Sequence, residues 1–243
     1  AIGCSTPVIP GLGLPATLTD ARLYLPDVAL VDTAGRRVPV TPTPSPWHRD
    51  GVVLLDFEDA SGGCRGTSAT NAVVAGTVPA GRYAGLEFKV GVPAPLNHTS
   101  TNKEPAPLDL VAMGWSWQAG RKFVKIELDP KGGVVRKAGR PAATWHLHLG
   151  STGCAGDPVK GESVSCATPN RIDVAFTRFD PSGDKVVLDL AQLFDGTDPG
   201  HDGGGALGCM SGPDDPDCPG VFRQLGLKPP ANPPPAFRVA PKG

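Results

Sequence analysis

Residues 108–128, LDLVAMGWSWQAGRKFVKIEL, are the stretch around which we expect the rest of the chain to fold. They hold two of the four tryptophans, Trp115 and Trp117, and one of the two methionines, Met113. Residues i and i+2 of a strand point to the same side, so a strand here would place these three side chains on one face. Residues 123–128 then alternate apolar and charged side chains, which is typical of a half-buried strand. The pattern alone favours a core strand whose tryptophans fill a β-sandwich.

The composition outside this stretch also predicts a mostly β fold. The 243 residues include 32 glycines and 28 prolines, spread along the chain as turns between short strands would be. Further strands are expected at 22–25, 52–57, 83–92, 144–149 and 171–176. We predict one disulfide-braced, β-sandwich-like domain with long Gly/Pro-rich loops over residues 1–227. The Pro-rich tail 228–243 is expected to be poorly ordered or extended.

The charge pattern excludes several classes of partner. The net charge is -1, with acidic and basic residues interspersed, so we expect no nucleic-acid patch and no polybasic membrane anchor. No apolar run reaches the roughly 18 residues of a transmembrane helix. The chain begins at Ala1 without a signal peptide, and a processed or trimmed form is therefore expected.

The six cysteines favour disulfides and an exported protein. Two pairs bracket short loops that are expected to close locally, which leaves one long-range bridge. The predicted pairs are Cys154 with Cys166, Cys209 with Cys218, and Cys4 with Cys64. A structural zinc site is the rival interpretation, but no CxxC pair is present. Ile-Gly before Cys4 also resembles a lipoprotein cleavage site, which leaves a lipid anchor open.

Enzyme signatures are missing from the sequence. It has no GxSxG elbow, HExxH motif, Walker loop or dinucleotide fingerprint. Cysteines in disulfides cannot act as nucleophiles, and no residue set can be named for a hydrolase. We therefore predict that the protein is not an enzyme.

Histidine and methionine favour a metal site. On a strand at 144–149, His146 and His148 share one face and the apolar residues share the other. His98 lies shortly before the tryptophan stretch, while His48 and His201 are interpreted as solvated loop residues. Imidazole suits copper and thioether sulfur selects Cu(I). The competing interpretation is structural, since His148 could be hydrogen-bonded in the core and Met113 could fill a gap.

Several motifs resemble those of one known family. They are RLYLPDV with LVDTAG at 22–35, LDFE at 55–58, VGVP with LNH at 90–98, MGWSWQ at 113–118, HLGSTGC at 148–154, and GCMSGP at 208–213 closing at Cys218. Together they are similar to the MbnP family, the four-cysteine partners of the metallo-mystery pair, over about residues 22–226. Two features depart from the family pattern: Arg121 stands where an aromatic residue is expected, and the usual strand before Cys4 is missing.

This resemblance implies a periplasmic Cu(I)-binding protein in copper homeostasis. The first tryptophan of its WxW motif, here Trp115, would be oxidised to kynurenine by a di-haem partner of the MauG/cytochrome c peroxidase (MbnH) type. An indole N–H only donates a hydrogen bond, whereas opening the ring leaves an aniline-type amine whose lone pair can reach copper. One histidine and one methionine, with a solvent molecule, would complete the site.

The sequence leaves the choice of ligands open. Strand alternation favours Met113 as the sulfur ligand, and Met210 in the second cysteine loop is the alternative. His98 and His148 rank level as the imidazole ligand, and His146 comes third. Trp117 is expected to shield the site or to assist electron removal, which Trp117→Phe would test. The rival function is an extracytoplasmic carbohydrate- or partner-binding β-sandwich that stacks ligands on exposed tryptophans.

Overall fold

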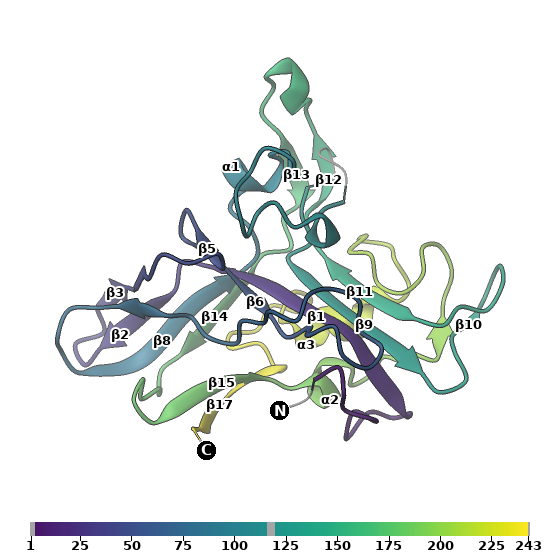
Figure 1. The fold of residues 1–243 in the computed structure, drawn as a ribbon, viewed down its shortest axis with the longest axis horizontal. Coiled ribbons are helices and arrows are strands. Elements are labelled where there is room, and N and C mark those ends of the chain that lie inside the picture. The colour runs from purple at the N-terminus through teal and green to yellow at the C-terminus, as the bar shows by residue number, and fades with distance from the viewer. Residues whose placement is uncertain (1–2, 116–119, 243) are drawn as a thin grey trace.

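Two antiparallel sheets carry the core, as the computed structural model of residues 3–115 and 120–242 shows (Figure 1). The larger sheet has the order β11 (Trp145–Leu149), β9 (Val124–Pro130), β1 (Ala16–Pro26), β6 (Val52–Asp56) and β5 (His48–Arg49). The second has the order β14 (Ile172–Phe176), β8 (Tyr83–Val90), β2 (Ala29–Asp32) and β3 (Arg37–Pro39). The predicted mostly β, single-domain, sandwich-like fold is confirmed.

Smaller elements surround these sheets. The paired strands are β4 (Thr41–Pro42) with β7 (Gly76–Thr77), β10 (Val135–Arg136) with β16 (His201–Asp202), β12 (Thr152–Ala155) with β13 (Ser165–Thr168), and β15 (Asp184–Leu188) with β17 (Phe237–Pro241). The helices are α1 (Ala94–Asn97), α2 (Leu190–Leu193) and α3 (Cys218–Gln224), with 3-10 turns η1 (Val111–Met113) and η2 (Pro158–Lys160). The β12–β13 hairpin projects away from the sheets, and α1 lies beside its base (Figure 1).

The inner face of the larger sheet forms the main core. Along β9 every second side chain is buried, including Val124, Ile126 and Leu128, as the alternating sequence predicts. Phe88 of the second sheet and Phe222 of α3 belong to the same buried cluster. Fully burying one such side chain contributes about 1.5–3 kcal/mol, so this face stabilises the pairing of β9 with its neighbours.

The opposite face of the larger sheet is polar in its middle. Strand register places Asp20 opposite Glu127, and Arg22 between Lys125 and Asp56. Towards one end this face becomes apolar and is covered by the 92–113 segment. The buried residues of that smaller cluster are Tyr24, Val52, Leu54, Val92, Leu108, Met113 and Phe123. The candidate site residues described below lie around this covered end and along the edge strand β11.

The strand predicted around the tryptophans is wrong in its first half. Residues 111–113 form η1 instead, and the chain then reverses so that Gly114 faces Arg121 across an antiparallel bridge. Gly120, at φ +83°, supplies the left-handed backbone that this reversal uses. Strand alternation therefore does not determine where the Met113 side chain points. Trp117 lies outside the described residues.

The three predicted disulfides are all present, at Cys4–Cys64, Cys154–Cys166 and Cys209–Cys218. Only the end of the Pro-rich tail is extended: most of residues 228–236 form turns and bends, whereas residues 237–241 pair with β15 and Phe237 is buried in the core. Within the described residues, no helix is long and apolar enough to cross a membrane.

Candidate metal centre

Trp115 lies at the start of the turn that follows η1. Its backbone N–H donates to the carbonyl of Gly120 at 3.0 Å, and its side chain is half-buried. The indole ring packs over Gly150, the residue after β11: a Cβ at position 150 would lie 2.5 Å from Cζ3 of Trp115. A side chain at position 150 would therefore occupy the space that the ring now fills.

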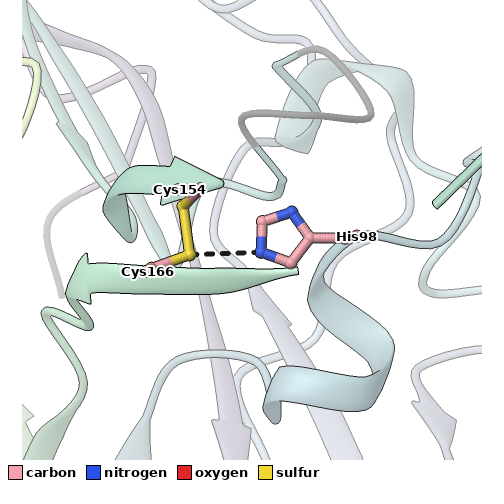
Figure 2. A group of neighbouring side chains, drawn as sticks. All are labelled: His98, Cys154 and Cys166. Carbon is pink, nitrogen blue, oxygen red and sulfur yellow. Dashed lines mark hydrogen bonds between the residues drawn. A yellow bond between two sulfur atoms is a disulfide. The ribbon is translucent and has the colours of Figure 1, made fainter. Parts of the chain in front are cut away.

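The His98 imidazole lies between α1 and the β12–β13 hairpin (Figure 2). Its Nε2 is 3.3 Å from Sγ of Cys166 and 3.0 Å from Nδ2 of Asn97. The sulfurs of Cys154 and Cys166 are bonded to each other, so they offer no thiolate to a metal. Of these three residues, His98 alone could offer a ligand atom to a metal ion.

Arg121 connects residues 96–99 (the His98 segment) to the turn that begins at Trp115 (the Trp115 turn). Its guanidinium is buried and donates to the carbonyls of Leu96 and Leu108 and to the Thr99 hydroxyl. Its backbone N–H donates to Oδ1 of Asn97 at 3.0 Å. Burial lowers the pKa of Arg121, but a guanidinium stays charged at neutral pH. Arg121 thus holds the segment through carbonyl oxygens. Nothing in the sequence marked this role except that Arg121 departs from the family pattern.

The two methionines have different surroundings. Met113 is fully buried in the smaller apolar cluster. Met210 is half-buried in the loop closed by the Cys209–Cys218 disulfide. In that loop the Ser211 hydroxyl accepts from the Gly150 N–H at 2.9 Å and donates to the His148 carbonyl at 2.7 Å. The Met210 loop is therefore tied to the residue over which Trp115 packs.

His146 and His148 point to the polar face of the larger sheet, as alternation predicts, and there they meet Glu127. Nε2 of His148 lies 2.7 Å from Oε1 of Glu127. Burial lowers the pKa of His148 to about 4, so this imidazole is neutral at pH 7. Of the remaining histidines, His201 is exposed and pairs with Asp198, so it is solvated as expected, but it lies in the short strand β16 and not in a loop.

The described tryptophans offer no exposed stacking platform. Trp145 is completely buried, and Trp47 and Trp115 are half-buried. Stacking of sugar rings needs an accessible aromatic face, so the carbohydrate-binding alternative finds no support in this part of the chain.

Comparison with known proteins agrees with the motifs. The family model described as MbnP matches residues 8–211. The solved structure of MbnP from Methylosinus trichosporium superposes with a TM-score of 0.89 at 40% sequence identity, covering 100% of this chain and 94% of that one. No protein in the curated set matches this chain. With a full-length structural match and a family model that spans most of the sequence, the chain belongs to the MbnP family.

Proposed function

We propose that this protein binds copper as Cu(I) in the periplasm, as part of copper homeostasis, and catalyses no reaction itself. We further propose that a di-haem partner matures the site by oxidising Trp115 to kynurenine. The observation that supports this most is the surroundings of Trp115, whose half-buried ring packs over Gly150. Gly150 is bonded to Ser211 of the Met210 loop, and Arg121, just beyond the Trp115 turn, is bonded to Asn97 beside His98. The three disulfides suit an exported protein.

The proposed oxidation would turn a poor ligand into a usable one. The indole nitrogen shares its lone pair with the ring and only donates a proton. Conversion to kynurenine removes one carbon, adds one oxygen and leaves an aromatic amine with a lone pair. An amine, an imidazole and a thioether form a nitrogen- and sulfur-rich set that favours Cu(I).

We assign His98 and Met210 as the protein ligands that accompany kynurenine-115. His98 lies on the segment that Arg121 and Asn97 fasten to the Trp115 turn. Met210 is half-buried in a loop bonded to Gly150. By contrast, the Met113 thioether fills an apolar cluster and His148 is paired with Glu127.

The two methionines give a matched test of this assignment. Met210→Leu is expected to weaken Cu(I) binding by at least about tenfold, because the thioether is replaced by a hydrocarbon of similar volume. Met113→Leu is expected to keep the affinity and to cost less than about 1.5 kcal/mol in unfolding free energy. Competition against a Cu(I) chelator measures the affinity, in protein produced together with the di-haem partner. If Met113→Leu weakened Cu(I) binding and Met210→Leu did not, Met113 would be the sulfur ligand. His98→Gln tests the imidazole ligand in the same way. It should weaken Cu(I) binding, whereas the control His201→Gln should keep the wild-type affinity.

Gly150→Ala tests whether the position of the Trp115 ring matters. The new Cβ would lie 2.5 Å from Cζ3 of Trp115 and 2.7 Å from the Arg121 carbonyl, so the ring must move. We expect less kynurenine and less copper per chain than in the wild type, together with about 1–3 kcal/mol of destabilisation from overpacking. The control is Gly13→Ala, where a Cβ meets no atom within 4 Å. Wild-type copper content in Gly150→Ala would contradict this dependence.

A further inference from the structure

A second group of possible ligands lies on the polar face of the larger sheet. His146 and His148 extend from β11, and Glu127 extends from the neighbouring strand β9. Nδ1 of His146 and Nε2 of His148 are 3.1 Å and 2.7 Å from the same oxygen, Oε1 of Glu127. The exposed fraction of the side chain is 24% for His146, 10% for His148 and 16% for Glu127. The group is therefore shielded but reachable from solvent.

The hydrogen bonding of this group is incomplete. Despite its short distance to Glu127, Nδ1 of His146 lacks hydrogen-bond geometry, and neither this nitrogen nor Nδ1 of His148 has a partner among the described residues. Buried imidazole nitrogens are normally satisfied. If Nδ1 of His146 carries no proton, its lone pair faces a carboxylate oxygen, and a cation between the two atoms would remove that repulsion.

The charges around the group are also unbalanced. Four carboxylates form an ion-pair network on this face, Asp20, Asp56, Glu58 and Glu127, and the cations paired with them are Arg22 and Lys125. Lys122 lies nearby but donates to the carbonyls of Ala112 and Gly114. Within this network negative charge exceeds positive charge even if Lys122 is counted, which favours the binding of a cation.

The residue types of this group suit a metal ion. Two neutral imidazoles and one carboxylate are a ligand set that divalent transition metals accept.

We propose that Glu127, His146 and His148 bind one divalent transition-metal ion of the Zn²⁺ type, at a site distinct from the one proposed for Cu(I). Tetrahedral coordination at Zn–N and Zn–O distances of about 2.0–2.1 Å separates neighbouring ligand atoms by about 3.3 Å. The two separations from Oε1 are 3.1 Å and 2.7 Å, so shifts of a few tenths of an ångström would admit the ion. Lys125 would give up Glu127 and keep its bond to Asp20.

Cobalt titration of protein produced without the di-haem partner tests the proposal, because Trp115 is then unmodified and the copper site is not matured. We expect one Co²⁺ per chain with visible ligand-field absorption, displaced by Zn²⁺. His146→Gln and Glu127→Gln should each weaken binding by at least about 100-fold, the upper end of the cost of losing a supporting partner. His201→Gln and His98→Gln should bind Co²⁺ as the wild type does.

Three results would overturn the site: no bound Co²⁺, equal affinity in His146→Gln and His201→Gln, or loss of binding in His98→Gln. Glu127→Gln also removes one of the two carboxylates that pair with Lys125 and is therefore expected to lower stability. His146→Gln avoids that difficulty, because His146 is the most exposed of the three and its Nδ1 makes no hydrogen bond. An unchanged thermal midpoint in His146→Gln makes its cobalt affinity decisive. A positive or negative outcome leaves the kynurenine proposal untouched.

Discussion

Trp115→Phe is expected to abolish copper retention in protein produced together with its di-haem partner. Phenylalanine preserves an aromatic ring over Gly150, so the local packing is largely kept. It has no nitrogen, however, and no oxidation can turn it into an amine ligand. Copper content by elemental analysis should fall to background, and the peptide that contains residue 115 should show no oxidised form. In the wild type, the same peptide should lose one carbon and gain one oxygen.

Trp47→Phe is the matched control for this change. Trp47 is also half-buried and packs against the smaller apolar cluster, but it is not placed at the proposed site. We expect wild-type copper and an oxidised residue 115 in this variant. Copper retained by Trp115→Phe at the wild-type ratio would refute the role proposed for kynurenine. Copper bound to a wild-type protein whose Trp115 is intact would do the same.

The sequence predicted those parts of the fold that local pattern determines. Alternation in 123–128 and 144–149 correctly indicated β9 and β11, and it correctly placed His146 and His148 on one face. Loop length correctly indicated the three disulfides. Most of these features depend on residues close together in the chain. The long-range disulfide Cys4–Cys64 could be predicted because the other four cysteines pair locally.

Other features depend on long-range pairing and could not be predicted in this way. Glu127 meets the two histidines only because the register of β9 and β11 places it opposite His146, and register depends on the whole core face. Alternation failed at Met113 because residues 111–113 form the 3-10 turn η1 and not a strand. Gly150 carries no side chain that could have marked it, although it sets the position of the Trp115 ring.

Among the variants proposed for this protein, Arg22→Met is expected to lower the unfolding free energy the most, by about 3–5 kcal/mol. The Arg22 guanidinium is 3% exposed and binds Asp20 at 2.6 Å, Asp56 at 2.9 Å and also Glu58. Removing it leaves three buried carboxylates, of which Asp20 keeps an ion pair with Lys125. Arg22→Lys should recover little of the loss, because one ammonium cannot reproduce the planar fork that reaches all three. The midpoint and slope of urea unfolding measure the effect.

The pH dependence separates loss of charge pairing from loss of packing. Burial already raises the pKa of Asp20 in the wild type, and without Arg22 the folded-state pKa of its neighbours should rise as well. A group with a raised folded-state pKa favours the folded state at acid pH and loses that contribution as the pH rises through the raised value. The destabilisation should therefore be small near pH 4 and grow towards pH 7. Arg36→Met, which breaks an exposed pair with Asp32, should cost less than about 1 kcal/mol. A penalty in Arg22→Met that does not change with pH would mean that the buried stem of Arg22, and not its charge, stabilises the sheet.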